Sequence, residues 1–351
     1  MKKLLLAAVA VLLVLLAAPL WKPIAKKSKW FIVATNIYQD ALRRAHLKSD
    51  QIGGEPVVNS DLVDLQQIDR TFDRYLKYSG LTRETLKDKT VLEIGPGDNI
   101  GVALRFLAAG AKRVVCIDKF VHYQDGPVHL RLYRSLRANL SPEDQARFDQ
   151  AVSLNDSVKV DPKRFEWIYG KGIEDTDSLF APGSFDVIVS AAVLEEIYDT
   201  DLAFAKMDRL LAPGGYTIHK IDLRDYEMFH KHGFHRLEFL TIPDSMYRYM
   251  TQASGQPNRR LVDYYRAKMA ELGYTSSIHI AMAAGGKEMD EYKLKLVNGV
   301  DYSQESLESY RAMRSRLLPR YQSLSDDDLI TEAILLAGHK PLQRGSTAPA
   351  F

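Results

Sequence analysis

Cysteine is almost absent from this chain of 351 residues, which contains only Cys116. A single cysteine can form no disulfide bond within the chain, so nothing in the composition requires an oxidising compartment. Cys116 lies inside an apolar run with the character of a β-strand, and a buried cysteine behaves as a small hydrophobic residue. We therefore expect Cys116 to be a core residue and not a nucleophile.

A large excess of charge of either sign is also absent. The chain has 47 basic and 45 acidic residues, with a formal net charge of +2. Six of the lysines and none of the acidic residues fall within the first thirty positions, so the remainder is mildly acidic. Because binding to nucleic acid requires a basic face, we expect no nucleic-acid partner. The lysines between Lys22 and Lys29 are better explained by contact with anionic lipid headgroups.

Long hydrophobic runs are missing everywhere except at the N-terminus, where Leu4 to Trp21 is apolar throughout. As a helix this run would span roughly 27 Å at 1.5 Å per residue, close to the thickness of a bilayer core. A cleaved signal peptide is the alternative, but Pro19 directly after Ala17 and Ala18 makes a poor cleavage site. More lysines follow the run than precede it, so the positive-inside rule predicts a single-pass anchor in the inner (cytoplasmic) membrane, with the body in the cytoplasm.

The glycine spacing of the nicotinamide-dinucleotide fingerprint is missing as well. The stretch from Val91 to Gly101 reads VLEIGPGDNIG, and its third glycine comes one residue later than that fingerprint requires. The stretch still has the form of a strand, a tight turn and a helix, which presents free backbone N–H groups to a ligand. The spacing disfavours a nicotinamide-dependent oxidoreductase, which we retain as a less favoured alternative.

Five segments in a fixed order support another interpretation. Glu93 precedes the first glycine by two residues, and Asp118 ends a second strand 23 residues after Gly95. Three further segments follow: FDVIVS (185–190), VLEEI (193–197) and LLAPGGY (210–216). Together these segments resemble the class I S-adenosylmethionine-dependent methyltransferases. The resemblance implies a Rossmann-like α/β fold, with a seven-stranded sheet, helices on both faces and an antiparallel last strand.

The same resemblance implies a site for S-adenosyl-L-methionine. Glu93 would face the methionine portion of the cofactor, and Asp118 would accept hydrogen bonds from both ribose hydroxyls. Ile173 and Glu174 would flank the adenine, and Ser190 would line the floor of the cavity. The complete set of expected cofactor residues is Glu93, Gly95, Gly97, Asn99, Gly101, Asp118, Ile173, Glu174 and Ser190.

The segment after the fifth strand resembles a subfamily of bacterial methyltransferases of small molecules and glycans that carry an H-x-IDLRD stretch, here residues 219–225. His219 could act as general base, since imidazole titrates near neutrality; a histidine inside a strand is as often a satisfied core group. Glu196 stands where many small-molecule relatives have a histidine, and it is a second candidate, with Asp222 as a third. We expect the acceptor to contact Arg224, Tyr226, Asn258 and Arg259.

Three histidines, at positions 230, 232 and 235, invite comparison with a metal site. Gly233 interrupts any helix there and no cysteine accompanies them, so we predict no metal. We interpret residues 226–258 as a lid inserted into a catalytic domain of residues 61–341. A basic juxtamembrane segment and linker (22–60) would precede this domain, and a disordered tail (342–351) would follow it.

The function that these patterns predict is transfer of a methyl group to an oxygen, or alternatively a nitrogen, of a small-molecule, glycan or lipid-linked acceptor. The Asn/Asp-Pro-Pro-Tyr/Phe sequence of methyltransferases that modify bases is absent after the fourth strand. A membrane-tethered module that binds S-adenosylmethionine without turning it over is the alternative from another class. The sequence does not determine the oligomeric state.

Overall fold

The computed structural model describes residues 28–47, 61–120 and 126–342, and for 61–64 it describes the backbone only. Within these residues a seven-stranded sheet has the order β5-β2-β1-β6-β7-β9-β8. The strands are β1 Thr90–Ile94, β2 Arg113–Asp118, β5 Phe165–Tyr169, β6 Phe185–Ala191, β7 Leu211–Asp222, β8 Thr275–Ala283 and β9 Thr331–His339. A separate pair of short strands consists of β3 Val152–Ser153 and β4 Lys159–Val160.

The predicted Rossmann-like α/β fold is confirmed. Strands β5, β2, β1, β6 and β7 run parallel to one another, whereas β9 is antiparallel to both of its neighbours, β7 and β8. The central strands are apolar because helices cover both of their faces. In β6, for example, the residues from Val187 to Ser190 are all buried. The antiparallel last strand is likewise as expected.

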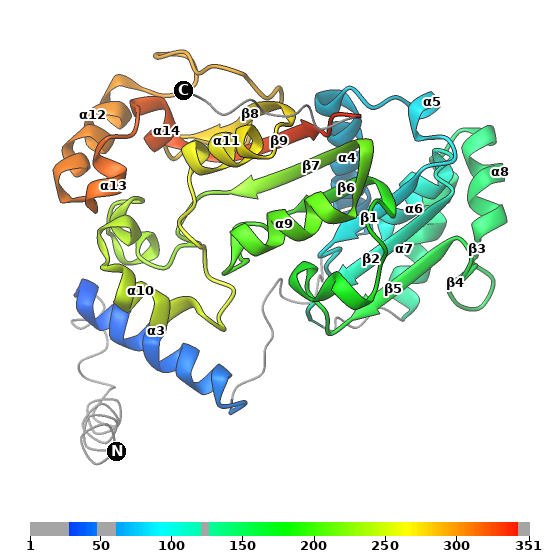
Figure 1. Ribbon diagram of the computed structural model, residues 1–351, viewed down its shortest axis with the longest axis horizontal. Coiled ribbons are helices and arrows are strands. Elements are labelled where there is room, and N and C mark those ends of the chain that lie inside the picture. The colour runs from blue at the N-terminus through cyan, green and yellow to red at the C-terminus, as the bar shows by residue number, and fades with distance from the viewer. Residues whose placement is uncertain (1–27, 48–60, 121–125, 343–351) are drawn as a thin grey trace. The chain divides into compact units, whose positions relative to one another are not determined.

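Helices pack on both faces of this sheet (Figure 1). On one face, the cluster around Phe72, Phe106, Tyr133 and Phe148 joins four helices to the strands. These are α4 Asp61–Ser79, α6 Gly101–Ala108, α7 Pro127–Ala138 and α8 Pro142–Ala151. On the other face lie α9 Thr200–Leu210 and α11 Val262–Glu271. The other helical segments in the part of the chain that contains the sheet are α5 Arg83–Leu86, η1 Ile173–Ser178, α12 Gln304–Met313 and α14 Asp326–Ile330.

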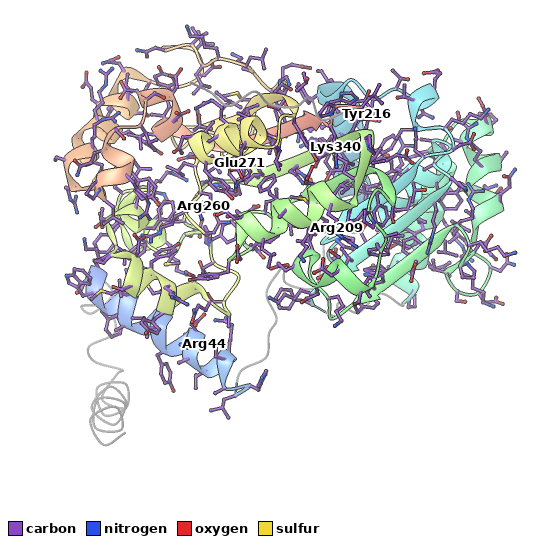
Figure 2. The ribbon with its side chains drawn as sticks, in the orientation of Figure 1. Arg44, Arg209, Tyr216, Arg260, Glu271 and Lys340 are labelled. Carbon is purple, nitrogen blue, oxygen red and sulfur yellow. The ribbon has the colours of Figure 1, made fainter. Side chains whose placement is uncertain are left out.

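The side chain of Lys340 connects two neighbouring strands of the sheet to a helix. The Lys340 ammonium, just beyond β9, donates a hydrogen bond of 2.9 Å to the carbonyl of Leu211, the first residue of β7. It also lies 3.2 Å from the Asp208 carboxylate of α9. Figure 2 shows Lys340 beside this strand start. The Lys340 ammonium therefore connects the end of β9 to the start of β7 and to the last turn of α9.

The chain divides into two compact units. The larger unit contains the sheet, and the smaller one comprises the described residues of 1–50 with Arg224–Gln256 and Met313–Ser323. The elements of the smaller unit are α3 Lys29–Arg44, η2 His230–His232, η3 Glu238–Thr241, α10 Asp244–Thr251, η4 Arg314–Arg316 and α13 Pro319–Gln322. Most of the segment interpreted as a lid, 226–258, belongs to this smaller unit.

Two buried carboxylates organise the smaller unit. Glu238 lies 2.9 Å from the Lys29 ammonium and 3.1 Å from the Arg316 guanidinium. Asp40 pairs with Arg44 at 2.9 Å and accepts a hydrogen bond of 2.6 Å from the backbone N–H of Ala253. A buried carboxylate needs such partners to offset its desolvation. These contacts connect three separate stretches of the chain.

The predicted anchor, Met1 to Trp21, lies outside the described residues, as do residues 22–27 and 48–60 of the predicted juxtamembrane segment and linker and the tail beyond residue 342. Among the helices of residues 28–47, 61–120 and 126–342, none combines the length and the apolar character that crossing a membrane requires.

Candidate active site

The glycine turn connects β1 to α6 at the carboxyl edge of the sheet. Gly95 and Gly97 have φ angles of +65° and +76°, a region in which glycine avoids the strain that other residues incur. A Cβ atom on Gly95 would lie 2.5 Å from Cγ2 of Val193, whereas one on Gly97 would have no atom within 4 Å. Gly97 therefore leaves open space at the turn, and a ligand can approach its backbone closely.

Asn99 and Gly101 shape the beginning of α6. The Asn99 side-chain oxygen accepts a hydrogen bond of 2.9 Å from the backbone N–H of Gly101. Gly101 has no room for a side chain, because Ile68 of α4 occupies that space. Both residues were expected to bind the cofactor; their observed contacts hold the turn and let α4 approach α6.

Glu93 is buried near the end of β1, beside Cys116 in the register of β1 and β2. The Cys116 thiol lies 3.6 Å from a carboxylate oxygen of Glu93. Burial raises the pKa of Glu93 from 4.5 to about 7, so the carboxyl group titrates near neutrality. Cys116 is fully buried, which confirms its expected place in the core.

Asp118 ends β2 and is buried. One of its carboxylate oxygens accepts a hydrogen bond of 2.9 Å from the backbone N–H of Phe120. Ile173, which is buried, and Glu174, which is half-buried, begin the helical turn after β5, the strand next to β2. The structure thus brings Glu93, Asp118 and Ile173 to the carboxyl ends of adjacent strands, the edge at which open α/β sheets bind ligands.

His219 lies within β7, opposite Ser190 of β6. The Ser190 hydroxyl is 2.7 Å from Nδ1 of the ring, and the Thr217 hydroxyl contacts Nε2. The imidazole is completely buried, and desolvation lowers its pKa from 6.5 to about 3. Both nitrogens of the His219 ring have hydrogen-bond partners, and its pKa is low. These properties fit the alternative in which His219 is a satisfied core group. Ser190 is one of its two hydroxyl partners.

The sequence did not identify Glu195, which is buried in the loop after β6. Its carboxylate accepts a hydrogen bond of 3.0 Å from the backbone N–H of Asp222, at the end of β7. Burial raises the pKa of Glu195 from 4.5 to about 8. Its neighbour Glu196 and Asp222 itself are half-buried at this edge. Two consecutive glutamates give no local signal of which one turns inward.

Asn258 holds the same loop from a distant part of the chain. Its side-chain amide donates hydrogen bonds of 2.7 Å to the Leu194 carbonyl and 2.9 Å to the Ile197 carbonyl. Its backbone N–H donates one of 2.7 Å to the carbonyl of Glu195. Asn258 was expected to contact the acceptor, but its amide is committed to the backbone of the loop.

Arg259 and Arg260 directly follow Asn258 in the chain. Arg259 is buried and has a φ of +64°, a conformation that is uncommon for residues other than glycine. Arg260, labelled in Figure 2, donates a hydrogen bond of 3.2 Å to the Thr200 hydroxyl and stacks on the Tyr264 ring at 4.4 Å. The other two expected acceptor residues, Arg224 and Tyr226, belong to the smaller unit and are half-buried there.

The histidines at 230, 232 and 235 are in the smaller unit. Nδ1 of His235 accepts a hydrogen bond of 3.1 Å from the backbone N–H of Leu237, and Nδ1 of His230 lies 3.3 Å from the Phe234 carbonyl. In the part of the chain that the structure describes, no group of three or more His, Cys, Asp or Glu side chains is placed to hold a metal ion.

Comparison with known proteins gives a family for this site. A family model described as a methyltransferase domain matches residues 65–268. No curated protein matches the sequence.

Among solved structures, the chain is similar to an S-adenosylmethionine-dependent methyltransferase from Listeria monocytogenes (17% identity, 78% of this chain and 99% of that one, TM-score 0.40). It is also similar to one from Mesorhizobium loti (13% identity, 78% and 100% covered, TM-score 0.39). A third is Haemonchus contortus phosphoethanolamine N-methyltransferase 2 with S-adenosyl-L-methionine (14% identity, 82% and 58% covered, TM-score 0.40).

Proposed function

Because the chain belongs to the methyltransferase domain family, we propose that it transfers the methyl group of its cofactor to an oxygen atom of a small-molecule, glycan or lipid-linked acceptor. The cofactor is S-adenosyl-L-methionine. The observation that carries the proposal is the set of residues at the carboxyl ends of β1 and β2. There a glycine turn with open space at Gly97 follows β1, and the buried carboxyl groups of Glu93 and Asp118 lie near the ends of the adjacent strands β1 and β2.

These residues fit the cofactor chemically. Asp118 ends the second strand, where its carboxylate can accept hydrogen bonds from ribose hydroxyls. Glu93 carries a carboxyl group with a pKa of about 7, which can accept a hydrogen bond from an ammonium group. Gly97 leaves open space beside its backbone, which a ligand can approach closely. When bound, the cofactor would supply a sulfonium methyl group for in-line transfer to a nucleophilic oxygen, with cleavage of the S–CH3 bond and release of S-adenosylhomocysteine.

The protein accelerates this reaction mainly by alignment. Holding donor and acceptor in one geometry can contribute on the order of 7–11 kcal/mol to lowering a barrier. The rigid edge of β1 and β6 provides that alignment, since Val193 of the loop after β6 packs on Gly95 of the turn. Glu196 or Asp222 would take the proton from the acceptor hydroxyl, because both are half-buried near the same edge.

The proposal includes attachment to the inner (cytoplasmic) membrane, with the domain in the cytoplasm. It is supported by the apolar run Leu4 to Trp21 and by the lysines that follow it. A protein anchored in this way would meet acceptors embedded in or carried by the membrane. Incubation of membranes with cofactor labelled in the methyl group should place label in the lipid fraction. Label confined to soluble metabolites would contradict a lipid-linked acceptor.

The direct test is calorimetric titration of the full chain in detergent with S-adenosylmethionine, S-adenosylhomocysteine and NAD. We expect the first two to bind and NAD not to bind. Asp118→Ala should weaken binding of S-adenosylhomocysteine by about tenfold or more, since a hydrogen bond to a charged group contributes about 1.5–3 kcal/mol. Asp156→Ala, at an exposed aspartate away from the strand ends, is the matched control. Unchanged affinity in Asp118→Ala would overturn the ribose assignment.

A further inference from the structure

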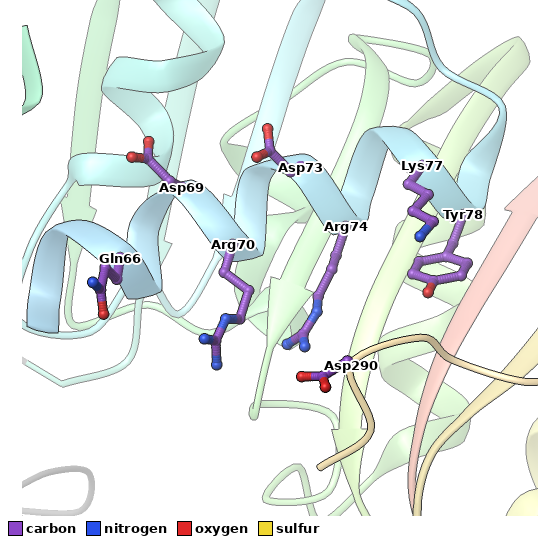
Figure 3. A pocket seen from close by; sticks show the side chains of 8 residues that line it. All are labelled: Gln66, Asp69, Arg70, Asp73, Arg74, Lys77, Tyr78 and Asp290. Carbon is purple, nitrogen blue, oxygen red and sulfur yellow. The ribbon is translucent and has the colours of Figure 1, made fainter. Parts of the chain in front are cut away.

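A cavity of about 410 Å³ lies along helix α4. It is lined by charged side chains of that helix and by Asp290, from the segment that follows β8. Arg70, Arg74 and Lys77 occupy one stripe of α4, because residues four and three apart share a helix face. Figure 3 shows Arg70 and Arg74 extending toward the side where Asp290 lies, while Asp69 and Asp73 extend from the other side of the helix.

Most of these charges already have protein partners. The Arg74 guanidinium lies 2.7 Å from the Glu288 carboxylate and stacks on the Tyr292 ring at 4.5 Å. Lys77 pairs with Glu291. On the other side of α4, Asp69 and Asp73 lie 3.1 Å and 3.8 Å from the guanidinium of Arg105.

Arg70 and Asp290 differ from these neighbours. Both side chains are exposed, and within the described residues neither makes a hydrogen bond or an ion pair. One is a cation and the other an anion, and Figure 3 shows both directed into the space below α4. Among the residues that the structure describes, the cavity therefore offers one unpaired positive charge and one unpaired negative charge.

Two ion pairs link Arg74, in the wall of the cavity, to the carboxyl end of β7. Glu288, which binds Arg74, also lies 2.6 Å from the ammonium of Lys220. Lys220 is near the carboxyl end of β7, and β7 is separated from β1 by β6. The cofactor residues Glu93 and Asp118 are on β1 and β2. The contacts of the cavity thus lead to the strand ends beyond those that hold the cofactor.

We propose that this cavity binds a zwitterionic amino-acid group of the methyl acceptor, with its carboxylate on Arg70 and its ammonium on Asp290. The inference rests on the proposed function, since it names the acceptor of that reaction. A guanidinium binds a carboxylate with two parallel hydrogen bonds, and a carboxylate accepts hydrogen bonds from an ammonium. A purely anionic ligand would face repulsion from Asp290, and a purely cationic one would face repulsion from Arg70, so the pair selects a ligand that carries both charges.

The methionine end of the cofactor also carries an ammonium and a carboxylate. The experiment must therefore distinguish an amino-acid group of the acceptor from that of the cofactor. Ligand-observed saturation-transfer NMR on the full chain in detergent would use glycine, acetate and methylamine as probes. We expect glycine to bind about tenfold more tightly than acetate or methylamine. Binding should persist when S-adenosylhomocysteine is saturating. Displacement of glycine by S-adenosylhomocysteine would assign the cavity to the cofactor and overturn the acceptor assignment.

Substitutions test the two charges separately. Arg70→Gln and Asp290→Asn should each weaken glycine binding by about tenfold or more, as expected for loss of a charge-assisted hydrogen bond. Neither side chain contacts another described residue through a hydrogen bond or ion pair, so both variants should fold. Arg248→Gln, at an exposed helical arginine of α10, is the matched control.

Other outcomes are equally informative. Equal affinity for acetate and glycine would overturn the zwitterionic ligand, and binding of none of the probes would overturn the site. Calorimetry with S-adenosylhomocysteine on the same samples separates these failures from a failure of the proposed function. A protein that binds S-adenosylhomocysteine but not glycine retains the proposed function and loses only this inference.

Discussion

The two halves of the carboxyl edge use their polar residues differently. At the ends of β1 and β2, the glycine turn leaves open space at Gly97, and Glu93 and Asp118 are buried near the ends of the two strands. At the ends of β6 and β7, Asn258 and His219 are committed to hydrogen bonds inside the protein. The first half leaves space that a ligand can enter, whereas the polar residues of the second half bind its own loop and strands. A polar residue in a binding motif therefore indicates a function only after its internal partners are known.

The largest expected effect comes from placing a methyl group at the glycine turn. Gly95→Ala would force alanine into a φ of +65° and place its Cβ against Val193, so we expect a loss of about 3 kcal/mol in stability and of detectable cofactor binding. Gly80→Ala is the control, because Gly80 has a φ of +78° but nothing within 4 Å. Thermal unfolding and calorimetry measure both variants. Equal losses would show that backbone strain alone, and not contact with the loop after β6, sets the effect.

Asn258→Ala would remove two hydrogen bonds from the loop carbonyls of Leu194 and Ile197. At about 1 kcal/mol for each bond, unfolding should become easier by about 2 kcal/mol. Methyl transfer should fall while binding of S-adenosylhomocysteine stays within twofold. Asn298→Ala, which removes an exposed amide contact with Gln304, should change neither quantity. A parallel drop in cofactor affinity would contradict the separation of the two halves.

His219 makes a pH-dependent prediction for the second half. Its folded pKa of about 3 is below the ordinary 6.5, so the unfolded chain binds the proton more readily. The stability that His219 contributes is complete above pH 6.5 and is lost as pH falls toward 3, by about 2 kcal/mol between pH 7 and pH 5. His219→Gln should flatten this part of the denaturation profile and leave the pH dependence of methyl transfer unchanged. A shifted rate profile would restore His219 as the base.

The smallest expected effect comes from a comparison of Glu93 and Glu195, the buried glutamates of the two halves. Glu93→Gln should weaken S-adenosylhomocysteine binding by about tenfold, because a carboxyl group that can ionise near pH 7 is lost from the cofactor side. Glu195→Gln should leave that affinity unchanged, since the amide oxygen can still accept from the N–H of Asp222. Calorimetry at pH 7.5 measures both. Equal weakening in the two variants would erase the distinction between the halves.

The sequence predicted the fold well because local patterns locate the strands and turns, and their resemblance to a known family implies how the strands are ordered. Apolar runs such as FDVIVS become buried parallel strands, and the turn at Gly95 needs a backbone that glycine supplies. The acceptor side was less predictable, since its contacts join distant residues. Asn258 binds carbonyls 61 and 64 positions away, and no local pattern encodes that pairing. The choice between Glu195 and Glu196 likewise depends on how a loop packs.

The place of β9 in the sheet has a consequence for how the chain folds. Strand β9 lies between β7 and β8, although both are synthesised before it. Until β9 emerges, β7 presents an open edge, and β8 has no neighbour on which to pair. We expect the nascent protein to complete its sheet only after residue 339 has left the ribosome, in a slow step dominated by contacts between distant residues. Ribosome stalling or premature termination before β9 would then leave an intermediate with an unpaired strand edge. We expect such an intermediate to aggregate readily and to bind chaperones.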